Sequence, residues 1–180
     1  ILNATEAYLI DHLNVIEPGE TYFYLHDYAT EKQLIMGNDV RLQNELVAHP
    51  FNYVRKQMRM RSATEEEVLQ FLKESDEERK VLDEELQQCI NEHPNLSQRY
   101  IKYVKHLHTM AQGNYLMMAQ FSRPESILPK ELVDYVTTNI WNNAHQHPYT
   151  LCSDFGQLMY YYTIHTDQCI NSQITPALPL

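Results

Sequence analysis

Glycine is scarce in this chain of 180 residues, which contains only Gly19, Gly37, Gly113 and Gly156. Glycine provides the tight turns and close backbone approaches that other residues adopt poorly, so a chain with few glycines seldom builds many short strands. The glycine-rich loops that bind phosphate, G-x-x-x-x-G-K-[ST] and G-x-G-x-x-G, do not occur in the sequence. The scarcity of glycine therefore favours long helices and excludes the common nucleotide-binding motifs.

Positive charge, paired cysteines and long apolar runs are also lacking. The 14 Lys and Arg residues stand against 24 Asp and Glu, and a net charge of −10 argues against non-specific binding to nucleic acid. Cys89, Cys152 and Cys169 are odd in number and form no C-x-x-C pair, which favours free thiols in a reducing compartment. No apolar run approaches the roughly 18–20 residues that span a bilayer. We therefore expect an intracellular, cytoplasmic protein without a transmembrane segment, which could touch a membrane only at its periphery.

No motif in the sequence predicts a metal site or a catalytic site. His106 and His108 are two residues apart, so on a helix they would point to nearly opposite sides. His145 and His147 lie in a predicted loop with Cys152 nearby, but no set of four ligands with workable spacing results. Neither H-E-x-x-H nor the G-x-S-x-G elbow occurs. The sequence therefore predicts no catalytic residue, no metal ion and no cofactor.

Apolar residues recur at a spacing close to 3.6 along most of the chain, which predicts an all-α fold. We expect a single-domain bundle of about six to seven helices that spans residues 1–180, belongs to a longer protein and ends in an extended tail at 171–180. The expected helices cover about residues 3–16, 20–36, 40–61, 64–91, 97–121, 129–143 and 153–170, and the third is kinked or split at Pro50. The run "QLMYYYTIHTDQCI" at 157–170 could instead form a strand.

The charge changes sign at one predicted helix boundary. Residues 55–61 carry four cations and no acid, and Glu65, Glu66 and Glu67 follow. Two overlapping capping boxes, Ser62 to Glu65 and Thr64 to Glu67, predict that a helix starts here. Cations in the last turn of one helix and acids in the first turn of the next both suit the helix dipoles, so the reversal is explained by helix boundaries alone.

A second basic segment raises a functional interpretation. Residues 99–108 also carry no acid, and Arg99, Lys102 and His106 are spaced to share one helix face. If segments 55–61 and 99–108 pack side by side, they form a positive surface suited to an anionic ligand. The predicted ligand-binding residues are Arg55, Lys56, Arg59, Arg61, Arg99, Lys102, Lys105 and His106. Pairing of these cations with the acid-rich stretch 74–85 is the competing interpretation.

The sequence favours a non-enzymatic helical interaction module, of the adaptor or effector type, that binds a protein partner through a polarised surface. One alternative is a binder of anionic lipid head groups, such as phosphoinositides, or of phosphorylated ligands, through residues 55–61 and 99–108. The other alternative is a helical-bundle enzyme with a pocket lined by histidine and tyrosine. Nucleic acid is not an expected partner.

Overall fold

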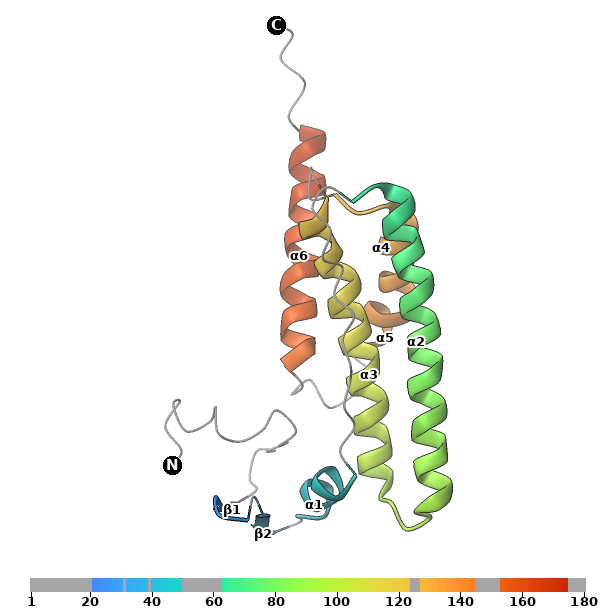
Figure 1. The fold of residues 1–180 in the computed structure, drawn as a ribbon. Helices are drawn as coiled ribbons and strands as arrows, with labels where there is room; N and C mark the ends of the chain where they lie inside the picture. The colour runs from blue at the N-terminus through green and yellow to red at the C-terminus, as the bar shows by residue number, and fades with distance from the viewer. Residues whose placement is uncertain are drawn as a thin grey trace, which may run out of the picture.

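The computed structural model describes residues 21–30, 32–38, 40–49, 63–123, 127–144 and 153–174. Helices predominate in this part of the chain, and a two-stranded sheet accompanies them (Figure 1). In chain order the elements are β1 (Tyr22–Asp27), β2 (Lys32–Gly37), α1 (Arg41–Ala48), α2 (Glu65–Glu92), α3 (Gln98–Met118), the 3₁₀ turn η2 (Ala119–Ser122), α4 (Lys130–Val136), the π-helical turn η3 (Thr137–Trp141), α5 (Asn142–Ala144) and α6 (Ser153–Ile174). The described residues are therefore predominantly helical, as predicted. Because α4, η3 and α5 follow one another without a gap as one helical segment, this part of the chain contains five helices rather than the expected six to seven.

Helix α3 forms the centre of the bundle. It runs antiparallel to α2, while α6 packs along another side and the segment from α4 to α5 lies behind (Figure 1). Every residue from Met110 to Met117 is buried, because α2, α4 and α6 all pack on this half of α3. The main core gathers there around Leu116, Leu132 and Leu158. None of the helices in the described residues is long and apolar enough to cross a bilayer.

Two side chains cap the N-terminus of α2 and fix where it begins. The Thr64 hydroxyl accepts the backbone N–H of Glu67 at 3.2 Å, and the Glu67 carboxylate accepts the backbone N–H of Thr64 at 2.7 Å. This reciprocal pair is the second of the two predicted capping boxes, and Glu65, Glu66 and Glu67 occupy the first turn as expected. The helix then continues without a break to Glu92, through the stretch in which acids and bases alternate.

Removing this cap should have a modest and specific effect. We expect Thr64→Ala to lower the free energy of unfolding by about 1 kcal/mol, because one backbone donor of the first turn loses its partner. Urea unfolding followed by circular dichroism measures the change. Glu66→Ala in the same exposed turn is the control, since no capping bond depends on that side chain, and equal losses in both variants would contradict the prediction.

The helix predicted at 20–36 is wrong, since the structure has an antiparallel hairpin of β1 and β2 in its place. Tyrosine and phenylalanine are frequent in "YFYL", and such residues favour the pleated, half-buried surface of a strand. Asp27 fixes the turn, because its carboxylate accepts the N–H of Ala29 at 3.0 Å and the hydroxyl of Thr30 at 2.6 Å. Gly37 ends the hairpin at a φ of 148°, where a Cβ would lie 2.1 Å from the Thr21 carbonyl oxygen.

The C-terminal run at 157–170 is helical rather than extended, since it lies within α6. This helix ends at Ile174, so it includes the first four residues of the segment predicted as an extended tail. The helix expected at 3–16 and the kink or split expected at Pro50 lie outside the described residues.

Candidate functional site

The predicted basic surface is only partly described. Arg55, Lys56, Arg59 and Arg61 lie outside the described residues. On α3, Lys102 and Lys105 are exposed and Arg99 is half-buried, but His106 is only 1% exposed. His106 therefore does not share the exposed face with Lys102, which corrects the spacing argument. Tyr103 and Met110, three residues before and four residues after His106 on α3, are buried as well, so this side belongs to the buried face and the polar face is narrower than the sequence implies.

The acid-rich stretch 74–85 has partners of its own within α2. The Lys80 ammonium lies 2.8 Å from the Asp76 carboxylate, and the Arg79 guanidinium lies 3.1 Å from that of Asp83. Both are (i, i+4) pairs on one helix. The Tyr135 hydroxyl of α4 also donates to Asp76, at 2.8 Å. The two ion pairs stabilise α2, and the hydrogen bond from Tyr135 connects α2 to α4.

The buried polar residues of the bundle join helices to one another. The Asn114 amide donates to the Asp154 carboxylate at 2.9 Å and to the Gln157 side chain at 2.7 Å, which connects α3 to α6. His165 of α6 accepts the backbone N–H of Leu128 at 3.0 Å. A groove of about 570 Å³ runs along α1, and its lining in the described residues includes His49 but no tyrosine. The described polar contacts thus connect α6 to α3 and to the segment that precedes α4.

One face of the hairpin is apolar and exposed. Phe23 lies opposite Met36 in the strand register, and Leu25 lies opposite Leu34. Side chains alternate along a strand, so these four share one face. They are 65%, 47%, 58% and 49% exposed, respectively. Ile35 is on the opposite face and is buried.

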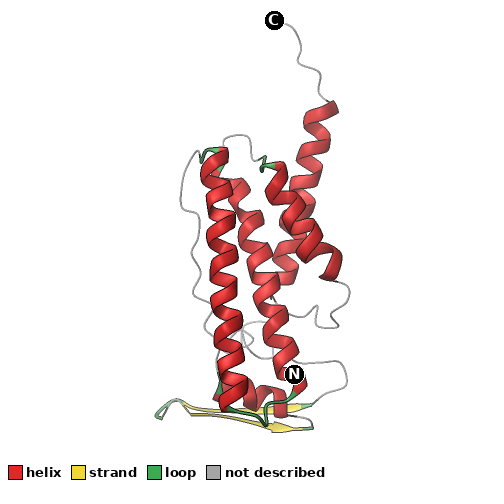
Figure 2. Ribbon diagram, turned by 90° about the vertical axis from the view of Figure 1, so that its right-hand side faces the viewer, coloured by secondary structure: helices red, strands yellow, loops and turns green. Residues whose placement is uncertain are grey.

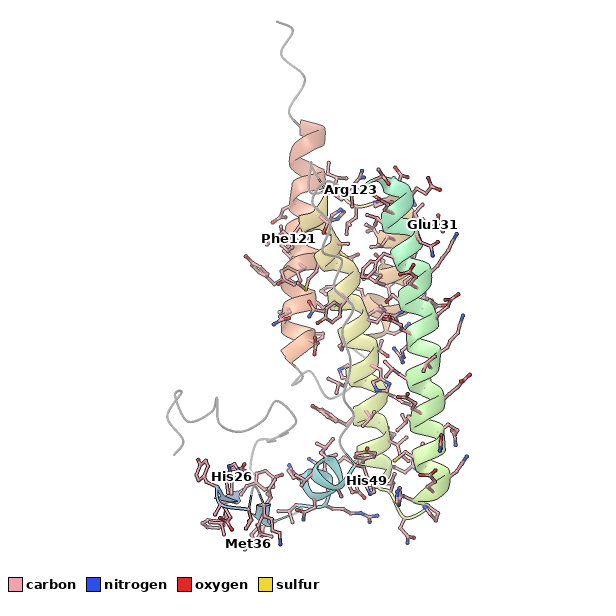
Figure 3. The ribbon with its side chains drawn as sticks, in the orientation of Figure 1. His26, Met36, His49, Phe121, Arg123 and Glu131 are labelled. Atoms are coloured by element: carbon pink, nitrogen blue, oxygen red, sulfur yellow. The ribbon has the colours of Figure 1, made fainter. Side chains whose placement is uncertain are left out.

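The hairpin lies at the level of the turn from α2 into α3, and Figure 1 shows it to one side of the bundle, beyond α1 (Figures 1 and 2). Its strand β2 packs against α1, and Figure 3 shows Met36 at the edge of the molecule below the helices. Four apolar side chains at these exposures amount to an area on the order of a few hundred Å², the size at which exposed patches mark interaction sites. We call Phe23, Leu25, Leu34 and Met36 the hairpin face.

Helix α1 is fixed to the turn between α2 and α3 by a polar network. The Glu45 carboxylate accepts the backbone N–H of Ser97 at 2.8 Å and also the Ser97 hydroxyl. Arg41 donates to Glu45 at 3.0 Å and to the carbonyl of Asn95. Beneath this network, a second core joins Leu42 and Leu46 of α1 to α2 and α3. Both the hairpin and the C-terminal end of α1 are therefore held in a defined place on the bundle.

The same network places three possible metal ligands together. His49 follows α1, Cys89 lies in the last turn of α2 and His93 follows α2. Their ligand atoms all lie within 4.8 Å of one another, and the two imidazole centroids are 4.2 Å apart. Burial, and then the nearby charge of Glu92, raises the pKa of the Cys89 thiol. A metal-free thiol of this kind stays protonated at neutral pH, so it is a poor nucleophile.

The sequence analysis missed both the hairpin face and this cluster. Cys89 and His93 form a C-x-x-x-H pair, whose spacing places both side chains on one helix face, and that signal was available. The sequence carries no signal for the position of His49, because that position depends on how α1 packs against α2 and α3. Comparisons of the chain with protein-family models, with curated proteins and with solved structures find no match.

Proposed function

We propose that this chain is a non-enzymatic helical interaction module that binds another protein through the hairpin face. The observation that supports this proposal is the pairing of Phe23 with Met36 and of Leu25 with Leu34 on one exposed side of the sheet. A two-stranded hairpin is marginally stable in water, and apolar side chains that face solvent add nothing to its stability. Their presence on a single face is explained by a partner that covers them.

The net charge of the chain indicates the chemistry of that partner. A second copy of this chain would also carry a charge of −10, and two such chains repel each other. A partner with an apolar patch surrounded by basic residues is attracted instead, and complementary charges speed its association. We therefore assign the hairpin face to a different, basic protein. A stable complex buries at least about 1,000 Å² in total, so the partner also covers surface beside the hairpin.

The experiment has two steps, crosslinking and then a binding assay. A photo-crosslinking amino acid replaces Leu34 in one version of the chain and Val81 in another, and both are irradiated in an extract of the source cells. Val81 is a matched control, since it is 53% exposed on α2, away from the hairpin. We expect position 34, but not position 81, to crosslink to one basic protein. Crosslinks from position 34 to residues 1–20 of the same chain, or to a second copy, would overturn the proposal.

The identified protein is then purified and titrated against variants. Leu25→Asp combined with Leu34→Asp should weaken its binding by at least about 100-fold, because two carboxylates would be buried against apolar side chains. Val81→Asp should leave both the affinity and the circular dichroism spectrum unchanged. If the double variant binds as tightly as the unchanged chain, the hairpin face is not the docking surface.

A further inference from the structure

We propose that His49, Cys89 and His93 bind a divalent transition-metal ion of the zinc type, at the end of the bundle where α1 meets the turn between α2 and α3. Imidazole nitrogen and thiolate sulfur are the ligands that zinc takes most often. The three ligand atoms lie within 4.8 Å of one another, while a tetrahedral zinc site needs separations of about 3.3–3.6 Å. Side-chain rotation closes this gap, because His93 is exposed and the other two are half-buried.

The backbone around all three ligands is already fixed. The N–H of His93 donates to the Cys89 carbonyl at 2.9 Å, which keeps these two residues one helical turn apart on the same face. The N–H of His49 donates to the Glu45 carbonyl at 2.9 Å, and the His49 carbonyl accepts the Tyr100 hydroxyl at 2.7 Å. The ligands therefore come from two helix ends whose positions do not depend on the metal, and binding would cost little backbone entropy.

The electrostatic surroundings favour a cation. His49 and His93 cap the C-terminal ends of α1 and α2, where the helix dipoles carry partial negative charge. Glu92 adds a carboxylate close enough to influence Cys89. Two converging helix C-termini and a carboxylate thus attract a divalent ion to the place where the ligands meet.

Tyr100 of α3 supports the ligands from the second coordination shell. Its side chain is fully buried, its hydroxyl donates to the His49 carbonyl at 2.7 Å, and the oxygen of the same hydroxyl lies against the Cys89 thiol. Partners of this kind orient metal ligands, and their removal commonly weakens metal binding by about 10–100-fold. Three protein ligands at the surface leave the fourth tetrahedral position to water.

A metal at this position would join α1 to the bundle. Because β2 packs against α1, the ion would also stabilise the support of the hairpin. This role is structural and does not depend on what the hairpin face binds. It revises the expectation from the sequence that no metal is present, which considered only pairs two residues apart and sets of four ligands.

The test titrates the full chain, freed of metal and kept reduced, with Co²⁺ as a spectroscopic substitute for Zn²⁺. We expect visible d–d bands and a near-ultraviolet band from thiolate-to-cobalt charge transfer, both saturating at one ion per chain. Added Zn²⁺ should displace Co²⁺ and abolish the bands. If the unchanged chain develops neither band, the proposal is overturned.

Matched variants assign the ligands. Cys89→Ser should remove the charge-transfer band, while Cys152→Ser, which alters a cysteine outside the cluster, should keep it. His49→Gln and His93→Gln should each weaken Co²⁺ binding by at least about 100-fold. Removal of a residue that only hydrogen-bonds to a ligand already weakens metal binding by about 10–100-fold, and a ligand itself contributes more. A charge-transfer band that survives Cys89→Ser but disappears in Cys152→Ser would place the metal elsewhere and overturn the assignment.

A stability measurement distinguishes metal binding from simple misfolding of a variant. Zn²⁺ at about 100 times its dissociation constant should raise the melting temperature of the unchanged chain by roughly 5–10 °C. Cys89→Ser should fold, as judged by circular dichroism, but show no such rise. A variant that melts normally and still responds to zinc like the unchanged chain would contradict the proposed site.

Discussion

Leu158→Ala is expected to lower the free energy of unfolding by about 3–5 kcal/mol, the largest effect of any single truncation that we consider. Leu158 is fully buried in the main core, where α6 packs against α3. Its two methyl groups lie 3.0 and 3.2 Å from the place where Gly113 would carry a Cβ, so this leucine fits directly against the bare backbone of α3. Because helices surround Leu158 on several sides, they cannot move into the space that alanine leaves. The free-energy cost of the resulting cavity is therefore near its maximum.

Urea unfolding and thermal melting both measure this effect, and the melting temperature should fall by roughly 6–20 °C. Met159→Ala is the matched control, because Met159 is the next residue of α6 and is 47% exposed. Met159→Ala should lower the free energy of unfolding by no more than about 0.5 kcal/mol, as at other surface positions. Equal losses in Leu158→Ala and Met159→Ala would show that α6 does not pack on α3 as the structure has it.

Gly113 offers a second check on the same contact. A Cβ there would lie 3.0 Å from Cγ2 of Ile140 and from Cδ2 of Leu158, which is closer than an ordinary van der Waals contact. Glycine in a helix costs up to about 1 kcal/mol relative to alanine, so only crowding opposes Gly113→Ala. In the Leu158→Ala background the two contacts with Leu158 are gone and the contact with Ile140 remains. The two substitutions should therefore couple, with Gly113→Ala less harmful or even stabilising in the double variant.

The long helices of this fold were predictable because local signals determine them. Thr64 accepts the N–H of Glu67 and begins α2 at one of the two predicted capping boxes. Ser97 accepts the N–H of Tyr100 and begins α3 where a helix was expected from about residue 97. The hairpin at 22–37 was not predicted, because a run with apolar residues on both faces fits a strand and a helix equally well. Aromatic residues ahead of the Asp27 turn were the signal that favoured strands.

The candidate sites were less predictable than the helices because both depend on tertiary contacts. The hairpin face is apolar in sequence, but only the register of β1 and β2 shows that its four side chains share one exposed side. His49 is 40 residues before Cys89, and the two meet because Glu45 fixes α1 to Ser97. The burial of His106 likewise reflects packing that a helical period alone does not specify.

Acid should destabilise this protein through its buried histidines, His108 among them. Burial, assisted by the positive charge of Arg79, lowers the pKa of His108 to about 4, against about 6.5 for an exposed histidine. The Asp83 carboxylate, 3.6 Å from Nδ1, opposes this shift but does not cancel it. The His108 side chain is 1% exposed, so water cannot solvate its charged form in the folded state. His165 is shifted in the same direction, again by burial.

The direction of the pH dependence follows from the two pKa values of His108, about 6.5 in the unfolded chain and about 4 in the folded protein. Below pH 6.5 the unfolded chain binds a proton on His108 and the folded chain does not, so stability is complete above pH 6.5 and is lost as the pH falls toward 4. The loss attributable to His108 should reach about 3 kcal/mol by pH 4. His108→Gln should be less stable than the unchanged chain at pH 7.5 but should lose about 3 kcal/mol less between pH 7.5 and pH 4. The carboxylates titrate both in His108→Gln and in the unchanged chain, so their contribution to the pH dependence cancels when the two are compared.

Urea unfolding at a series of pH values measures this difference, with a chelator present so that no metal binds. Val81→Ala is the control, because that side chain is exposed and carries no ionisable group, so its removal should leave the slope of stability against pH unchanged. If His108→Gln and the unchanged chain lose stability in parallel from pH 6.5 to pH 4, His108 is not held neutral by burial. The packing of α3 against α2 around Arg79 and Asp83 would then be looser in solution than the structure has it.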